Sequence, residues 1–252
     1  RRPARGDPRL LRAGARGRHL VDPQAGGRLM AMLGQAAVLI WNDVLDSAET
    51  AFYAWHDKEH IPERLALPGF LRGRRYRGDG EPAWLTVYEA EDLAVLTSPA
   101  YLERLNHPTP LTRATVQAFR NTARSICRVE RSAGGSTGGH ALTLHLPAGL
   151  ALDVEALFTQ LLGMTGVLAA HLLTADEAAS RIDTAESRQR AFVVPARVLM
   201  VEASTPAAAQ AALDVLVEAA GAAGGDAARV ATAAGAGIYA LEISRLPARD
   251  PL

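Results

Sequence analysis

The sequence is poor in cysteine, has no long apolar run and carries no net charge. A single cysteine, Cys127, excludes an internal disulfide framework and cysteine-rich zinc sites, and it suits a reducing cytoplasm. No run of about 18 apolar residues is present, so no membrane-spanning helix is expected. With 48% hydrophobic and 21% charged residues, the composition is typical of a soluble globular protein.

The sequence also lacks the short motifs of several large enzyme classes. It contains no G-x-S-x-G nucleophile motif, no P-loop and no dinucleotide fingerprint. It has no motif that combines basic and aromatic residues for nucleic-acid binding. We therefore expect no cofactor, no nucleic-acid partner and no membrane partner.

The zero net charge hides a basic N-terminal segment. Residues 1–29 contain eight Arg and two Asp among Pro and Gly, so the rest of the chain is acidic. The segment shows no sustained apolar period and cannot bury enough apolar surface to order itself. We expect residues 1–31 to be a disordered Arg-rich extension, which is either sequence outside the fold or an anion-binding or targeting arm.

After residue 31, strand and helix patterns follow one another in the same order twice. Apolar and β-branched runs predict strands in the first part at residues 35–44, 70–77, 83–89 and 122–130, and helical patterns lie at 48–55, 92–105 and 111–119. The second part predicts strands at 141–146, 167–174, 197–203 and 238–244, and helices at 153–162 and 206–223. We expect a first repeat at 32–133, a Gly/Ser-rich flexible linker at 134–139 and a second, degenerate repeat at 140–247.

Each repeat has the order βαββαβ, which forms a four-stranded antiparallel sheet with both helices on one face. The other face is left bare, and packing it against a second sheet buries it. Two copies in one chain can do this internally. We predict an α+β fold in which two tandem ferredoxin-like repeats pack sheet to sheet.

The segment from Trp55 to Arg64 holds the densest cluster of reactive side chains. His56 and His60 are four residues apart, so they share one face of a helix, and Glu59 lies beside them. Histidine can transfer protons near neutral pH, and a nearby carboxylate can orient its ring. We predict that His60 is a general acid or base, supported by His56 or Glu59. The alternative is a histidine at a helix end that binds a free carbonyl group.

The same residues fit the H-x-x-E-H pattern of inverted zinc peptidases, from His56 to His60. Zinc would need a third protein ligand from elsewhere in the chain and a water molecule. Pro62 and the βαββαβ order both argue against that fold. We expect no metal at this site.

Two strands place large polar and aromatic side chains on one face each. In the second strand this set is Phe70, Arg72, Arg74 and Tyr76, and in the third it is Trp84, Thr86 and Tyr88. The opposite faces carry smaller residues, as does the fourth-strand set of Ala123, Ser125 and Cys127. Smaller residues suit contact with helices, so we expect the large sets inside the barrel.

Arginine and aromatic side chains in a concave, partly dry space favour a planar carboxylate or enolate ligand. We therefore predict the substrate-binding residues to be Arg64, Arg74, Tyr76, Trp41 and Tyr88. The alternative is that the arginines lie at strand ends and are solvated, and we favour this alternative for Arg75 and Arg77.

The second repeat lacks the reactive cluster. Its first helix, at 153–162, contains no histidine and no arginine, and His171 takes the position of Arg74. Residues 174–195 form a long polar insertion where the first repeat has a short turn. A loop of this length is typically either a lid or disordered. The candidate site is thus a feature of one copy.

The block His56–Arg64, with PGF at 68–70, GRRY at 73–76 and SPAYL at 98–102, resembles the dimeric α/β-barrel superfamily. It looks most like EthD-like and related uncharacterised members, here in tandem-duplicated form. The resemblance covers residues 34–131 by motif and 140–246 by topology. That superfamily includes monooxygenases, muconolactone isomerase-like enzymes, polyketide cyclases and haem-degrading enzymes, so it implies a fold and not a reaction. A haem-using member would need an axial histidine inside its cavity.

Three functions fit these observations. The leading one is a cofactor-free enzyme that moves a proton on a small acidic or aromatic compound, as an isomerase, cyclase, dehydratase or monooxygenase-like protein. The second is a non-catalytic small-molecule binding or accessory protein that uses the same cavity. The third is a structural barrel filled by side chains. A homodimer is compatible with all three.

Overall fold

The computed structural model of the chain describes residues 31–189, 191–224 and 237–248. The expected Arg-rich extension, residues 1–31, lies outside these ranges apart from Ala31. Among the helices within these ranges, none is long and apolar enough to cross a membrane.

Both halves of the described chain follow the order βαββαβ. The first half consists of β1 (Ala36–Val44), η1 (Asp46–Ala48), α1 (Glu49–Trp55), η2 (His56–His60), α2 (Ile61–Leu65), β2 (Phe70–Arg77), β3 (Trp84–Ala90), η3 (Val95–Thr97), α3 (Pro99–Asn106), α4 (Pro110–Val116) and β4 (Phe119–Gly134). The second half consists of β5 (His140–Leu146), α5 (Val154–Gly163), β6 (Val167–Ala175), α6 (Glu177–Ser180), η4 (Ser187–Gln189), β7 (Arg197–Ala203), α7 (Pro206–Ala222) and β8 (Gly237–Arg245).

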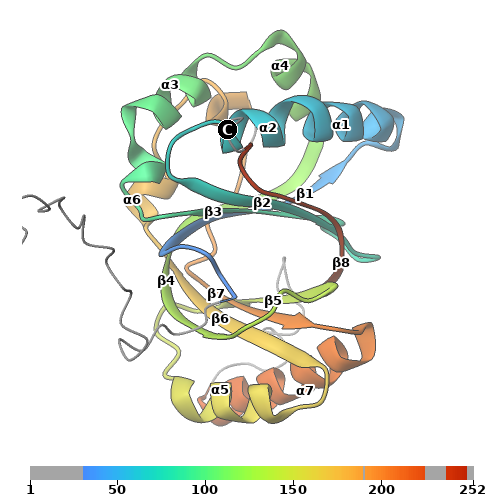
Figure 1. Cartoon of the computed structure of the whole chain (residues 1–252), viewed down its shortest axis with the longest axis vertical. Coiled ribbons are helices and arrows are strands. Elements are labelled where there is room, and N and C mark those ends of the chain that lie inside the picture. Colours follow the sequence, from blue (N-terminus) through green and yellow to red (C-terminus); the bar gives the residue numbers. More distant parts are fainter. Residues whose placement is uncertain (1–30, 190, 225–236, 249–252) are drawn as a thin grey trace, which may run out of the picture.

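The strands of the described chain close into one barrel in the order β1-β3-β2-β8-β5-β7-β6-β4. Each half contributes one four-stranded antiparallel sheet. The two sheets join along two antiparallel seams, β2 with β8 and β4 with β6. Figure 1 shows the sheets facing each other, with the helices of each half on the outside. The predicted α+β fold of two ferredoxin-like halves packed sheet to sheet is confirmed.

The passage from the first half to the second contributes contacts to the barrel. β4 pairs with β1 and then with β6, where it reaches Gly134 opposite Ala169. Within the expected linker, the Thr137 hydroxyl accepts a hydrogen bond of 2.8 Å from Arg72. The Gly138 N–H donates one of 2.7 Å to Glu202. Residues 137 and 138 therefore connect β2 of one half with β7 of the other.

The structure corrects the expected orientation of several strand residues. The side chains of Arg72, Arg74 and Tyr76 lie inside the barrel, as predicted. Phe70 was predicted on the same face but packs on the helix side, because the register of β2 shifts between Phe70 and Arg72.

In β3 and β4 the predicted faces are reversed. The interior cluster contains Leu85, Val87, Ala123 and Cys127. The clusters beneath the first-half helices contain Trp84, Tyr88 and Ile126. A barrel of this size is only just wide enough for side chains to fill. Its interior already holds Trp41, Arg74 and Tyr76, and the smaller residues of β3 and β4 complete the packing.

Buried ion pairs cross the barrel interior. Arg74 is fully buried, with its Nη1 2.8 Å from Glu202 Oε1 and its Nη2 2.9 Å from Glu89 Oε1. Arg72 Nε lies 2.8 Å from the same Glu89 oxygen. His171 Nε2 lies 3.3 Å from Glu202 Oε1. Two guanidinium groups thus face two carboxylates, and the network joins β2 and β3 to β6 and β7.

This network predicts acid-sensitive stability. Burial raises the pKa of Glu202, but hydrogen bonds and charge from His171 and Arg74 outweigh it and hold that pKa at about 2, below the ordinary 4.5. Because the folded pKa is depressed, the stabilisation is present above about pH 4.5 and is lost as pH falls towards 2. Urea unfolding of the wild type at several pH values should show this loss. The Glu202→Gln variant should be less stable at neutral pH, and its free energy of unfolding should change less with pH over that window. An equal change with pH in both proteins would contradict the role of Glu202.

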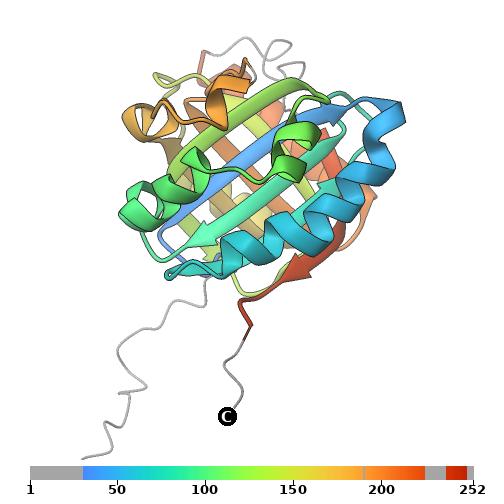
Figure 2. The ribbon, with the colours of Figure 1, turned by 90° about the horizontal axis from the view of Figure 1, so that it is seen from above.

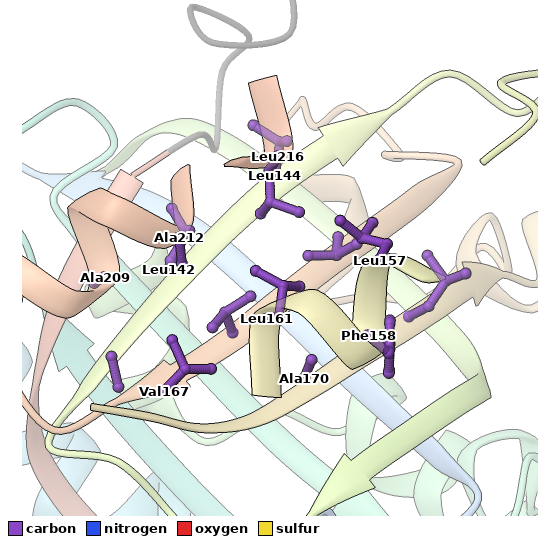
Figure 3. Close-up of a cluster of buried hydrophobic side chains, with 14 of the residues drawn as sticks. Leu142, Leu144, Leu157, Phe158, Leu161, Val167, Ala170, Ala209, Ala212 and Leu216 are labelled. Atoms are coloured by element: carbon purple, nitrogen blue, oxygen red, sulfur yellow. The ribbon is translucent and has the colours of Figure 1, made fainter. Parts of the chain in front are cut away.

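The second half has an apolar core between its sheet and its helices. Figure 3 shows Leu157, Phe158 and Leu161 of α5 directed towards the apolar side chains of the sheet and of α7. All three are buried. This side of the second sheet is the structural counterpart of the face that carries the histidines in the first half.

The long insertion lies against the first half. We call residues 176–189, which include α6 and η4, the strap. Its first part is fixed to β4, where the Asp176 N–H donates to the Ile126 carbonyl at 2.8 Å and the Ile126 N–H donates to Ser180 Oγ at 2.9 Å. Figure 2 shows this orange segment beside the green helices of the first half. The sequence left open whether the insertion is a lid or disordered, and residues 176–189 pack against β4 and the end of α3.

Candidate functional site

The segment from His56 to His60 forms a π-helical turn between α1 and α2. The Ile61 N–H donates to the His56 carbonyl, which lies five residues back. Pro62 has no N–H, so it cannot continue the α-helical pattern with the carbonyl of Lys58. Single π-helical turns within helices occur frequently at functional sites. The turn places both histidines on the side of the helix that faces the sheet, where each is buried.

The two imidazoles lie in an aromatic cluster. The Trp55 ring centroid is 4.2 Å from that of His60 and 5.5 Å from that of His56. Phe52 stacks on His56 with a centroid distance of 5.2 Å. Trp55 is held in place by its indole N–H, which donates to Thr112 Oγ1 at 2.9 Å. The ring positions are therefore fixed by packing from α1, α4 and the sheet.

His56 is held in one tautomer by its two neighbours. Arg75 Nη1 lies 3.1 Å from His56 Nδ1, and because a guanidinium can only donate, Nδ1 is the acceptor. The other ring nitrogen, Nε2, therefore carries the hydrogen and donates to the Tyr88 hydroxyl at 3.2 Å. Burial, followed by the charges of Arg75 and Arg64, holds the pKa of His56 well below its ordinary value. His56 is a neutral hydrogen-bond relay between Arg75 and Tyr88.

This tautomer can be tested in solution. We expect side-chain ¹⁵N NMR to show His56 protonated at Nε2 only, with no titration as pH falls through the ordinary histidine value of about 6.5. Arg75→Gln should allow both tautomers, because its amide can present either an acceptor or a donor to Nδ1. Titration of His56 near the ordinary histidine value would contradict the relay.

Arg75 and Arg64 surround the histidines with buried positive charge. Arg75 is 3% exposed, so the expectation that it is solvated at a strand end is wrong. It pairs with Asp57 at 2.5 Å and with Glu242 of β8 at 2.7 Å. Arg64 is also 3% exposed, and its Nη2 lies 2.8 Å from Glu186 Oε2 of the strap. The second half thus supplies two carboxylates to the arginines of the first-half site.

A small cavity lies beside His56 and His60. Its volume is about 20 Å³, which is enough for one water molecule. The residues that line it are Ile40, Asn42, Phe52, Trp55, His56, His60, Thr86, Tyr88, Phe119 and Glu186. Imidazole, phenol, amide and carboxylate groups therefore meet in one buried space.

The structure brings together only part of the predicted site. His56, His60, Arg64 and Tyr88 gather on the helix side of the first sheet. Glu59 lies next to them in sequence, but its carboxylate accepts hydrogen bonds from Thr109 and Thr112 of α4. These five predicted residues come from one helix and one strand.

The other three predicted residues lie on the opposite face of the sheet. Arg74 donates to the Tyr76 hydroxyl at 2.6 Å inside the barrel, and the Trp41 indole donates to Thr143 Oγ1 at 3.1 Å. The expectation that Arg74 and Tyr76 face the same space as His60 is wrong. Arg75, the neighbour of Arg74, points to His56, and successive side chains of a strand point to opposite faces.

Four residues of the candidate site were not among the predicted site residues. Asn42 lies in the strand predicted at 35–44 and Trp55 begins the reactive segment, but neither was assigned a role. Arg75 was assigned to solvent, since alternation alone does not show which side a helix covers. Glu186 lies 122 residues from Arg64, and no periodic signal joins such positions.

Metal binding finds no further support in the described ranges. There, no group of three or more His, Cys, Asp or Glu side chains is arranged to hold a metal ion. Both ring nitrogens of His56 already have partners, because Nε2 donates to the Tyr88 hydroxyl and Nδ1 accepts from Arg75.

Comparisons with known proteins identify the fold. Neither the protein-family models nor the curated proteins gave a match. Among solved structures, an anthrone oxidase-like protein matches with a TM-score of 0.58 and 14% identity over 87% of this chain and 96% of that chain. A putative monooxygenase from Fusobacterium nucleatum matches with a TM-score of 0.48 and 8% identity over 85% of this chain and 96% of that chain. A putative chlorite dismutase matches with a TM-score of 0.49 and 11% identity over 84% of this chain and 96% of that chain. The fold of this chain is thus similar to that of the anthrone oxidase-like protein.

Proposed function

We propose that this protein is a small-molecule enzyme that uses no bound cofactor and removes a proton from a carbon next to a carbonyl group. The reaction takes place in the cavity between the π-helical turn and the first-half sheet. His60 is the base that accepts the proton. Tyr88 donates a hydrogen bond to the carbonyl oxygen as negative charge develops there. His56 is a positioning residue that acts through Tyr88.

The observation that carries the proposal is the difference between the two halves. The same face of the second sheet is covered by Leu157, Phe158 and Leu161. At the corresponding face of the first sheet, His56 and His60 are buried. Burying polar groups costs free energy that an apolar core avoids. The same fold carries an apolar covering in one half and buried histidines in the other. This difference supports a functional reason for the buried histidines.

The roles follow from the hydrogen bonds. The Tyr88 oxygen accepts from His56, so its own O–H is available to a ligand. Burial raises the pKa of Tyr88, and the phenol stays protonated at neutral pH. When His60 takes the proton, the electron pair of the broken C–H bond delocalises onto the carbonyl oxygen, where Tyr88 donates. Return of the proton to another carbon completes an isomerisation.

The same first step begins the other reactions that fit the site. An enolate can attack a second carbonyl in a cyclisation, or expel hydroxide in a dehydration. With dioxygen as the oxidant it can also begin an oxygenation. The proposal therefore concerns the proton transfer that these reactions share.

We further propose that the asymmetry between the halves arose after a duplication. The equal order of elements in both halves supports a tandem duplication, after which one copy kept the reactive residues. The block at 56–64 and the SPAYL motif at 98–102 support an EthD-like relationship.

Hydrogen–deuterium exchange at carbon tests the proposal. Phenylpyruvate carries an acidic C–H next to a ketone, and the ketone carbon bears a carboxylate. Anthrone, named for the anthrone oxidase-like neighbour, has no carboxylate, and its acidic C–H is conjugated with the carbonyl through the aromatic rings. In D₂O we expect the protein to exchange at least one of them about tenfold or more above the buffer rate, measured by proton NMR. Exchange of both compounds at the buffer rate would contradict the proposal.

A further inference from the structure

We propose that the ligand of this site carries a carboxylate that binds Arg64, and that the Glu186 carboxylate of the strap holds that position until the ligand displaces it. The inference rests on the proposed function, because it takes the cavity beside His60 as the place of the reacting group. It adds a chemical class of ligand, an acid with an apolar body, and a means by which the chain closes its own site.

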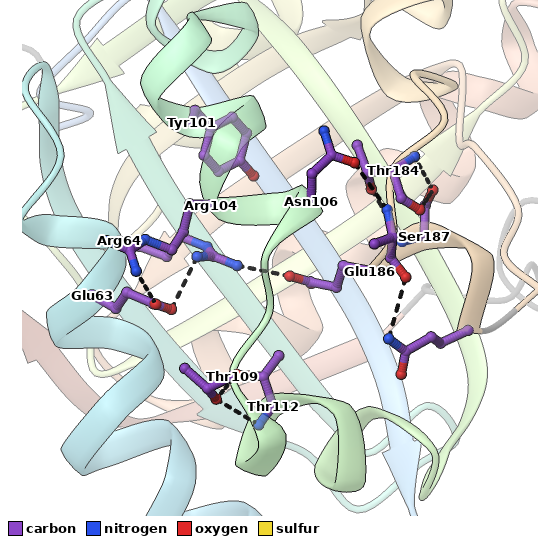
Figure 4. Close-up of polar contacts among 12 residues, drawn as sticks. Glu63, Arg64, Tyr101, Arg104, Asn106, Thr109, Thr112, Thr184, Glu186 and Ser187 are labelled. Atoms are coloured by element: carbon purple, nitrogen blue, oxygen red, sulfur yellow. Dashed lines mark hydrogen bonds and ion pairs between the residues drawn. The ribbon is translucent and has the colours of Figure 1, made fainter.

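The Glu186 carboxylate binds Arg64 in the way expected of a ligand carboxylate. Figure 4 shows its side chain extending from the strap towards Arg64 and Arg104. Its Oε2 lies 2.8 Å from Arg64 Nη2, and Arg64 is buried. The remaining charges nearby are matched, because Glu63 pairs with Arg64 at 3.1 Å and with Arg104 at 3.0 Å. Withdrawal of Glu186 leaves this group with one positive charge in excess.

That excess charge selects the ligand. A guanidinium group presents two parallel N–H bonds that match a carboxylate. Removing one carboxylate from a buried arginine is costly, and a neutral ligand that displaced Glu186 would leave Arg64 with only Glu63, which it shares with Arg104. A ligand carboxylate restores the pair.

The cavities on either side of Glu186 indicate the shape of the ligand. Glu186 lines the cavity beside His60 and also lines a second cavity of about 20 Å³ beneath the strap. The second cavity is mainly apolar, with Leu96, Leu102, Leu105, Ile126 and Ile182 in its wall. Each alone has room for about one water molecule. Movement of Glu186 joins the two into one space with an apolar end and a polar end.

The strap is attached at this point by a small number of polar contacts. The Glu186 N–H donates to the Leu105 carbonyl at 3.1 Å, and the Ala185 N–H donates to Asn106 Oδ1 at 3.1 Å. Both acceptors lie at the end of α3. Elsewhere the strap is fixed to β4 through α6. Residues 184–187 can therefore leave α3 while α6 stays in place.

Binding of 2-naphthoate tests the inference, with 2-naphthamide as its neutral counterpart of equal shape. Isothermal titration calorimetry is expected to show that Glu186→Gln and Glu186→Ala bind the acid about tenfold more tightly than the wild type, because no internal carboxylate has to be displaced. Glu177→Gln removes another strap carboxylate, which is 74% exposed and pairs with Arg181, and should change nothing.

Arg64 variants complete the test. Arg64→Gln should lose the preference for the acid over the amide. Arg64→Lys keeps the charge but not the two parallel N–H donors of the guanidinium group, so it should bind the acid about tenfold more weakly than the wild type. Circular dichroism checks that each variant is folded. Unchanged acid affinity in both Glu186 variants, or a preserved preference for the acid in Arg64→Gln, would overturn the inference.

Failure of this inference is separable from failure of the proposed function. 2-Naphthoate has no acidic C–H next to a ketone, so it reports binding alone. Acid binding that follows Arg64 and Glu186 supports the inference even where carbon exchange is absent. Enzymatic exchange of anthrone without any preference for acids supports the proposed function and contradicts the inference.

Discussion

Replacing His60 with alanine is expected to lower the enzymatic rate of carbon–hydrogen exchange by about 10²- to 10⁴-fold, the usual contribution of a general base. His60 is 5% exposed and is packed against Trp55 at the cavity wall. An alanine there removes the base while the relay from Arg75 through His56 to Tyr88 stays in place. Affinity for 2-naphthoate should change little, since the carboxylate is bound by Arg64.

The matched control is His107→Ala. His107 lies at the end of α3 with its side chain 72% exposed, so the same substitution should leave both exchange and stability unchanged. Exchange rates are compared by proton NMR on proteins whose circular dichroism spectra agree. Equal exchange by the wild type and His60→Ala would show that another group takes the proton.

Replacing Arg74 with methionine is expected to lower the free energy of unfolding by about 3–5 kcal/mol. Methionine approximates the volume of the side chain but leaves Glu89 and Glu202 without Arg74 in the barrel interior. An uncompensated buried charge is far more costly than a missing surface ion pair. Urea unfolding at neutral pH measures the difference.

The control for this change is Arg128→Met in β4. Arg128 pairs with Asp176, and its side chain is 63% exposed, so its loss should cost less than about 1 kcal/mol. Similar small losses for both variants would mean that the interior pairs contribute little to stability. Together the His60 and Arg74 variants separate the two faces of the first sheet, one affecting the reaction and the other the fold.

The secondary structure could be predicted from sequence because its signals are local. The second strand was expected at 70–77 and the structure has β2 at Phe70–Arg77, and the strand expected at 197–203 is β7. The repeated order of elements then led to the barrel. These features depend on hydrophobic runs and turn residues a few positions apart.

The faces of the strands could not be predicted as reliably. Alternation divides a strand into two sets but does not show which set a helix covers. Small residues were assigned to the helix side, yet Leu85 and Val87 fill the narrow interior and Tyr88 lies beneath the helices. Arg74 and Arg75 are neighbours of the same type, and only distant partners, Glu202 and Glu242, distinguish them.

The candidate site was found in part because its histidines are close in sequence. The spacing of His56 and His60 predicted one helix face, and their rings are stacked with centroids 5.8 Å apart. Pro62 disrupts the helix locally because it has no N–H, but its presence in the sequence did not predict a π-helical turn. The strap could not be placed, since its contact between Glu186 and Arg64 depends on the folded barrel.

We expect ligands to bind on the helix side of the first sheet and not inside the barrel. Two tryptophans report on these spaces separately: Trp55 donates its indole N–H to Thr112 beside the cavity, and Trp41 donates its own to Thr143 in the interior. Titration with 2-naphthoate, followed through the indole signals in ¹H–¹⁵N NMR spectra, should shift Trp55 and leave Trp41 in place. A shift of Trp41 with Trp55 unchanged would place the ligand inside the barrel and contradict binding beside His60.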